Sequence, residues 1–247
     1  MEEWKYRQIL LAPLALTSER LDEIVEAFVL PPRASVLEIG CGEAGLMVTI
    51  ARQFGATCTG LDDRPATIAR ARRNAQAANV DDLVNPILED AFAFRAIPRS
   101  YDATLSLAGT WVLGGFRRTL VRLAEWTLPG GIIAIGETFA FEPPEAAYFR
   151  GRSVAPSAFR SHEGNIAIGI EEGLQFVDSW QATQEEWDAH HESQFGAARR
   201  WLAANPADGD ALEVRSRIDS AERRFFEQDR FQQRWATYLF QKPTRGP

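Results

Sequence analysis

The chain has 247 residues, of which 45% are hydrophobic and 25% charged, and its formal net charge is −7. These fractions are typical of a globular protein with a substantial core, and they exclude collagen-like, low-complexity and wholly disordered chains. Because no apolar run approaches the roughly 20 residues that cross a bilayer, and because an acidic surface repels a phosphate backbone, we expect neither membrane insertion nor nucleic acid binding.

A short hydrophobic stretch lies near the start of the chain, from Ile9 to Leu16, and Pro13 interrupts it. A secretory signal is the alternative interpretation, but acidic residues precede the stretch where a signal carries basic ones, and no clear small-residue cleavage site follows. The two cysteines, Cys41 and Cys58, are too few for a disulfide framework. We therefore expect a cytoplasmic protein.

Hydrophobic spacing divides the next part of the chain into alternating helices and strands. Helical spacing predicts a helix at 17–30, which Pro31 and Pro32 end. Short buried runs predict strands at 35–40, 57–62, 84–90, 101–107 and 131–137, with helices at about 47–54, 65–78 and 114–127. This alternation predicts a largely parallel sheet with helices on both faces.

The alternation lapses after Glu137. Residues 138–163 are rich in aromatic residues and proline without a clean period, which is typical of a covering loop. Thr183 and Glu186 have the spacing of a capping box, which predicts the start of a helix. In order, we predict helix 163–172, strand 174–181, helices 183–205 and 209–231, and strand 235–241.

The strongest local motif is VLEIGCGEAG at 36–45, where a predicted strand passes into a helix. Gly40 and Gly42 allow the backbone to turn sharply and approach a ligand, and the helix that follows presents free N–H donors. With Gly45 the pattern is GxGxxG, and Asp62 stands 22 positions after Gly40 at the end of the second predicted strand. A nicotinamide-dependent (NAD(P)) oxidoreductase is therefore one interpretation.

Three further features favour a different cofactor. Glu38 stands two residues before Gly40, where a carboxylate can face a cationic amine directly or through water. The segment EDA at 89–91 follows the third predicted strand, where a carboxylate can accept the exocyclic amine of adenine. A PGG turn at 129–131 leads into the fifth strand. In this order, across about 35–137, these residues resemble the class I S-adenosylmethionine-dependent methyltransferases.

The resemblance implies a Rossmann-like α/β fold: a seven-stranded, mostly parallel sheet with helices on both faces and an antiparallel last strand. The whole chain, 1–247, would then be a single methyltransferase domain. Its parts would be a cofactor-binding core at 33–137, an N-terminal cap at 1–32, a covering loop and helix at 138–173, and a helical insertion at 182–233 before the last strand.

The resemblance also implies the cofactor, S-adenosyl-L-methionine, with S-adenosyl-L-homocysteine as the product, and the residues that bind it. These residues follow the first four predicted strands. They are Glu38, Gly40, Cys41 and Gly42 along the methionine part and ribose, Asp62 and its neighbour Asp63 at the ribose hydroxyls, Asp90 and Ala91 at the adenine edge, and Ser106, Leu107 and Ala108 near the methyl-transfer point.

Each acidic residue also has an ordinary structural explanation when taken singly. Glu38 fits a solvated charge at a strand end, Asp62 fits a helix cap, and Asp90 fits a turn residue. Cys41 and Cys58 have no cysteine or histidine partner at metal-ligand spacing, so we predict no metal.

The implied reaction is attack by a nucleophile on the methyl group of a sulfonium. Alignment of the two reactants can contribute roughly 7–11 kcal/mol, so a general base is needed only for acceptors such as protonated amines, alcohols or phenols. Glu137, at the end of the fifth strand, and His162, beside the covering loop, are the candidate bases. Tyr148 is a candidate hydrogen-bond donor to the acceptor.

The absence of two motifs favours a small-molecule acceptor. The segment LSLAGTW after the fourth strand lacks the Asn-Pro-Pro-Tyr of amide and adenine-amine methyltransferases, and no Pro-Cys pair is present for attack on a cytosine ring. Trp111, Phe139, Phe141 and Phe149 suggest an apolar binding face, and anchoring of the loop to the core is the alternative.

Two questions stay open from the sequence. The inserted helices fit a lid, a homodimer surface or simple cover for the sheet. A cofactor-binding partner subunit without catalysis is the remaining alternative to an enzyme.

Overall fold

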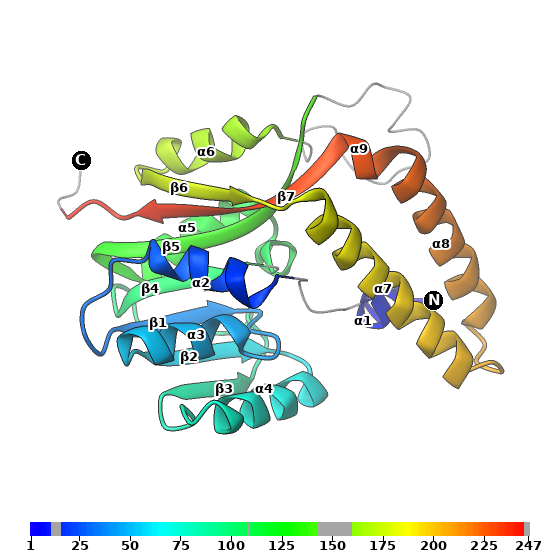
Figure 1. Ribbon diagram of the computed structural model, residues 1–247, viewed down its shortest axis with the longest axis horizontal. Coiled ribbons are helices and arrows are strands. Elements are labelled where there is room, and N and C mark those ends of the chain that lie inside the picture. Colours follow the sequence, from blue (N-terminus) through cyan, green and yellow to red (C-terminus); the bar gives the residue numbers. More distant parts are fainter. Residues whose placement is uncertain (11–15, 108, 143–159, 245–247) are drawn as a thin grey trace.

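The computed structural model describes residues 1–10, 16–107, 109–142 and 160–244. Its strands are β1 (Ser35–Ile39), β2 (Thr57–Asp62), β3 (Val84–Leu88), β4 (Tyr101–Ser106), β5 (Thr127–Ala140), β6 (Gln175–Gln181) and β7 (Gln233–Gln241). They form a seven-stranded sheet in the order β3-β2-β1-β4-β5-β7-β6 (Figure 1). Strand β7 is antiparallel to both β5 and β6, and the pairs among β1 to β5 are parallel. The expected Rossmann-like fold with an antiparallel last strand is confirmed.

Helices cover both faces of the sheet (Figure 1). They are α1 (Glu3–Leu10), α2 (Ser18–Glu26), α3 (Gly45–Phe54), α4 (Pro65–Ala77), α5 (Phe116–Trp126), α6 (His162–Glu171), α7 (Gln184–Ala204), α8 (Ala211–Arg224) and α9 (Arg230–Gln232), with a 3-10 turn η1 (Thr110–Leu113) and a π-helical turn η4 (Phe225–Asp229). None of the described helices is both long and apolar enough to cross a membrane.

The alternation of side chains along β1 separates the two hydrophobic cores. Val36 belongs to the cluster that contains the buried residues of α2, α3 and α4. Leu37 and Ile39 are buried in the other cluster, with residues of α5 and α6. Leu37 points to the face opposite Val36, because successive side chains of a strand point to opposite faces. A continuous apolar run is therefore what a strand covered on both sides requires.

The structure extends or divides some of the predicted elements. Strand β5 continues through Ala140, because residues 138–140 pair with residues 233–235 of β7. The second inserted helix ends at Arg224, where the chain enters the π-helical turn η4. Residues 143–159, the greater part of the expected covering loop, lie outside the described residues.

The helices inserted between β6 and β7 project beyond the edge of the sheet where strands β1 to β5 end (Figure 1). Helix α7 begins with the predicted capping box: the Thr183 N–H donates to Glu186 at 2.7 Å, and the Glu186 N–H donates to Thr183 at 3.2 Å. Helix α1 packs against α7, and Lys5 forms an ion pair with Asp208 at 3.6 Å. The first helix is thus joined to the insertion.

Candidate functional site

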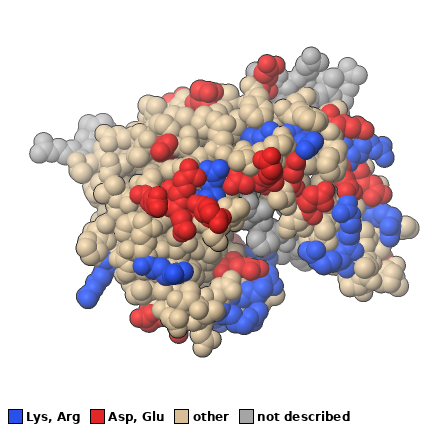
Figure 2. Space-filling view, in the orientation of Figure 1, with Lys and Arg blue, Asp and Glu red and all other residues tan. Residues whose placement is uncertain are grey.

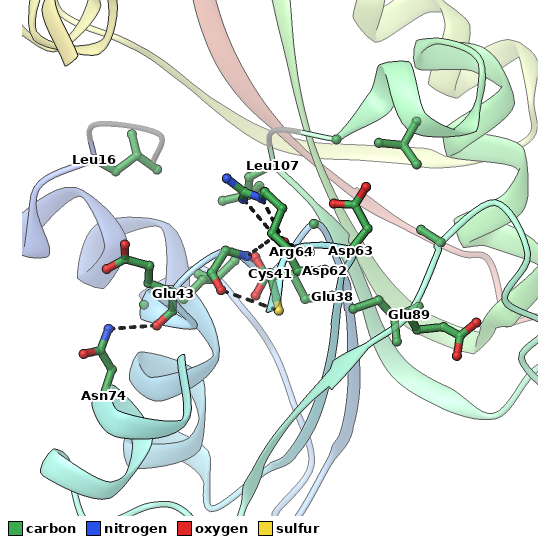
Figure 3. Close-up of a pocket in the computed structure, with 18 of the residues that line it drawn as sticks. Leu16, Glu38, Cys41, Glu43, Asp62, Asp63, Arg64, Asn74, Glu89 and Leu107 are labelled. Atoms are coloured by element: carbon green, nitrogen blue, oxygen red, sulfur yellow. Dashed lines mark hydrogen bonds and ion pairs between the residues drawn. The ribbon is translucent and has the colours of Figure 1, made fainter. Parts of the chain in front are cut away.

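A cavity of about 600 Å³ opens where the carboxyl ends of β1, β2, β3 and β4 meet (Figure 3). Its wall consists mainly of the segments that follow these four strands, together with the start of α2. Ligands of open α/β sheets bind at this edge, and the volume lies in the range of small-ligand sites. The position of the cavity therefore makes it the candidate site.

The turn after β1 takes its shape from two glycines. Gly40 and Gly42 have φ angles of +71° and +54°, in the left-handed region that glycine adopts without strain. The N–H groups of Gly40 and Cys41 donate to the carbonyl oxygen of Leu61 at 2.8 and 3.0 Å, which ties the turn to β2. Burial raises the pKa of the Cys41 thiol, so this residue acts as a small apolar side chain and not as a nucleophile.

Asp62 lies at the end of β2 and lines the cavity although it is buried. Its Oδ2 accepts the Gly42 N–H at 3.2 Å, so the glycine turn and the carboxylate are fixed relative to each other. Its Oδ1 accepts the Arg64 N–H at 3.0 Å, next to the start of α4. Asp63 and Arg64 also line the cavity, and Figure 3 draws both beside Asp62.

Glu38 lies in the cavity wall with only 4% of its surface exposed. Its Oε2 has no hydrogen-bond partner among the described residues. Burial, and then the charge of Asp62, raise the pKa of Glu38 to about 8. The residue is therefore not a solvated charge at a strand end. A buried carboxyl oxygen without a partner is costly, and a cationic group in the cavity would supply that partner.

The segments after β3 and β4 complete the wall. Asp90 and Ala91 line the cavity, and Asp90 also accepts the Phe92 N–H at 2.8 Å, so its role as a turn residue is real as well. Leu107 lines the cavity, whereas Ser106 is buried and lies outside the lining. Ala108 lies outside the described residues.

The candidate bases lie away from the cavity lining. Glu137 is held by two hydrogen bonds of 2.9 Å, one from the Thr110 hydroxyl and one from the Thr138 N–H. Burial raises its pKa. His162 forms a 3.1 Å hydrogen bond with Ser179, and burial lowers its pKa. Tyr148 lies outside the described residues.

Of the three aromatic candidates that the structure describes, Trp111 lines the cavity, whereas Phe139 and Phe141 contact each other outside the lining, with ring centroids 5.3 Å apart. Trp111, which is 47% exposed, lines the cavity. Phe139 is buried against His162, with ring centroids 5.2 Å apart, and Phe141 stacks with Arg234 at 5.2 Å. Phe149 lies outside the described residues. Of the described members, Trp111 is the one in the cavity wall.

Several lining residues could not be identified from the motifs. Leu16 and Leu21 come from the segment that begins α2, which reaches the cavity only through tertiary packing. Asn74 projects from α4 and donates to the Glu43 carbonyl at 3.0 Å. The sequence does contain a sign of Arg64, because this cation directly follows the two acids at 62–63.

Comparisons with known proteins agree with this geometry. Residues 36–131 match the family model of a methyltransferase domain. The protein YjhP of Escherichia coli K12 is 32% identical over 212 residues, which cover 85% of each chain. The ribosomal protein L11 methyltransferase of Burkholderia vietnamiensis is 30% identical over 139 residues, 56% of this chain and 43% of that protein.

A solved structure extends the likeness to the whole chain. The S-adenosylmethionine-dependent methyltransferase of Geobacter sulfurreducens, crystallised with S-adenosyl-L-homocysteine, superposes with a TM-score of 0.85 at 29% identity. The match covers 96% of this chain and 97% of that one. Together with the methyltransferase domain and the YjhP match, it shows that the chain belongs to the class I S-adenosylmethionine-dependent methyltransferases.

Proposed function

We propose that this enzyme methylates a small-molecule acceptor, and that the cavity beside β1, β2, β3 and β4 is where it binds S-adenosylmethionine. In this proposal Glu38 faces the cofactor amine and Asp62 takes the ribose hydroxyls. Gly40, Cys41 and Gly42 lie along the methionine part, Asp63 stands beside the ribose, and Asp90 with Ala91 borders adenine. Leu107 lies near the methyl-transfer point, and Ser106 supports it from the core.

The unpartnered oxygen of Glu38 is the observation that carries the proposal. Glu38 and Asp62 line one cavity, and the turn between them is built on glycines with left-handed backbone. A ligand that bears both an ammonium group and a vicinal diol matches this set of donors and acceptors. The residues present therefore fit the cofactor.

When bound, S-adenosylmethionine supplies a methyl group that a sulfonium already activates. The protein's own task is then to align the acceptor and keep water out, which can contribute roughly 7–11 kcal/mol. Leu107 and Val112 give the cavity wall near the methyl-transfer point an apolar character. Glu137, His162 and Tyr148 stay predictions for a general base or acceptor contact.

A small acceptor is favoured by the rim of the cavity. Trp111 is half exposed there and offers a flat face on which an apolar or aromatic acceptor can stack. Its turn η1 is fixed from below by the bond from Thr110 to Glu137. A protein acceptor, which the L11 methyltransferase name suggests, is the competing possibility, and residues 105–111 carry no Asn-Pro-Pro-Tyr segment for an amide.

Release of S-adenosylhomocysteine tests the choice of acceptor. The purified enzyme should be incubated with S-adenosylmethionine and panels of phenols, amines, thiols and indole-like compounds, with ribosomal protein L11 in parallel. We expect release with at least one small molecule and none with L11, and we expect Asp62→Ala to abolish it. Methyl transfer to L11 alone would contradict a small-molecule acceptor.

A further inference from the structure

The carboxylate of Asp62 already accepts four hydrogen bonds, all from the protein. Its Oδ1 accepts from the backbone N–H and from Nε of Arg64, both at 3.0 Å. Its Oδ2 accepts from the Gly42 N–H at 3.2 Å and from Nη2 of Arg64 at 3.0 Å. A carboxylate offers about four acceptor positions. None of them is left for a ribose hydroxyl.

The two bonds from the Arg64 guanidinium can be broken by a change of side-chain rotamer, whereas the two backbone bonds cannot. The N–H groups of Gly42 and Arg64 belong to the glycine turn and to the segment that starts α4, so they stay in place as long as the fold does. The two guanidinium bonds come from a flexible side chain that is 24% exposed, while the Asp62 side chain is 4% exposed. Figure 3 draws the two guanidinium bonds from this side chain to Asp62 as dashed lines.

We infer that the Arg64 side chain competes with the cofactor ribose for Asp62 and so lowers the affinity for the cofactor. The inference rests on the proposed function, in which Asp62 takes the ribose hydroxyls. A two-point guanidinium–carboxylate bond is charge-assisted and stronger than a bond from a neutral hydroxyl. The ribose must therefore replace a strong internal partner.

The displaced guanidinium can turn toward solvent. The Arg64 side chain is already 24% exposed, so rotation away from Asp62 moves its charge toward water and does not bury it without a partner. Asp63, the next acid in the chain, lines the same cavity. Arg64 is a residue that sets affinity, and not a catalytic residue.

Calorimetric titration with S-adenosylhomocysteine tests this inference. We expect Arg64→Met to bind about tenfold more tightly than the wild type, since one charge-assisted internal interaction no longer has to be broken. Arg64→Lys should fall between the two, because an ammonium group cannot form the two-point bond. Arg73→Met removes the same charge from an exposed position on α4 and should bind like the wild type.

Unchanged or weaker binding by a folded Arg64→Met would overturn the inference, since Arg64 would then only hold Asp62 in place. Thermal melting establishes folding, and Arg64→Lys gives the same comparison if the methionine variant does not fold. Asp62→Ala separates this inference from the proposed function. If Asp62→Ala binds like the wild type, the proposed ribose contact is wrong; if it loses binding while Arg64→Met gains nothing, only the role of Arg64 is wrong. In an Asp62→Ala background the Arg64→Met gain should disappear.

Discussion

Glu38 and Asp62 bring two carboxyl groups to one cavity, and the two groups differ in their hydrogen-bond partners. Asp62 is fully paired, whereas Glu38 is buried with an oxygen that has no partner among the described residues. Burial and the nearby charge of Asp62 raise the pKa of Glu38 to about 8. Near neutral pH, Glu38 therefore holds a proton until a cation enters the cavity.

Cofactor binding should consequently release a proton. An ammonium group beside Glu38 favours its carboxylate, so the pKa of Glu38 falls from about 8 toward its ordinary value when the ligand binds. At pH 7 we expect release of close to one proton, and affinity should rise about tenfold between pH 6 and pH 7. Calorimetry with S-adenosylhomocysteine in buffers of different ionisation enthalpy measures this number directly.

Glu38→Gln provides the control, because a glutamine has no proton to give up. This variant should bind more weakly and with no comparable proton release. The same proton count in both proteins would show that Glu38 does not face the amine.

Among single residues, the sequence motif alone predicts that Glu38, Asp62 and Asp90 lie near one another. It does so because residues that follow neighbouring parallel strands meet at one edge of the sheet. The motif could not reveal that Arg64 bonds to Asp62, since a side-chain rotamer depends on the contacts around it. Nor could it reveal that Thr110 and the Thr138 N–H hold Glu137.

At the level of elements, β5 packs closely against the segment that follows β4, and Gly136 makes this close packing possible. A Cβ atom on Gly136 would lie 2.1 Å from the Leu107 carbonyl oxygen and 2.4 Å from the Trp235 ring. Glycine at 136 therefore allows β5 and the Leu107 backbone to lie close together. Any side chain there would displace the backbone of Leu107, a residue of the cavity wall.

Gly136→Ala should destabilise the fold by about 1–3 kcal/mol or more, because overpacking forces the backbone to shift. Thermal melting measures the loss, and S-adenosylhomocysteine binding should weaken with it. Gly209→Ala is the matched control, since a Cβ atom on Gly209 would meet nothing within 4 Å. Equal melting temperatures for the two variants would contradict this account of β5.

The elements of the core were predictable because each is short and has a clear hydrophobic period. Strand β2 and the capping box of α7 lie where the sequence places them. Helix α1 was not predicted, since its partner α7 is nearly two hundred residues away in the chain. The extension of β5 to Ala140 depends likewise on pairing with β7, which a local pattern does not contain.

At the level of the whole molecule, family membership decides between the cofactors that the glycine pattern left open. GxGxxG followed by an acid also fits a nicotinamide-dependent oxidoreductase, whereas the match to methyltransferases spans nearly the whole chain. The division into core, cap, covering segment and insertion stays a prediction. The cap and the insertion are in contact, because α1 of the cap packs on α7 of the insertion.

Charged side chains of both signs lie on the face of the molecule shown in Figure 2. Acidic side chains gather over α2, and acidic and basic side chains alternate on the inserted helices, on the face shown in Figure 2. A homodimer and a cytoplasmic location stay expectations from the sequence.

Titration of the protein with S-adenosylhomocysteine, with Asp62→Ala and Asp82→Ala in parallel, tests whether this cavity binds the cofactor. Asp82→Ala removes the same charge from an exposed position. We expect saturable one-to-one binding by the wild type and by Asp82→Ala. Asp62→Ala should lose at least about tenfold in affinity, because a charged acceptor is removed. Equal affinity in all three proteins would contradict the assignment of this cavity as the cofactor site.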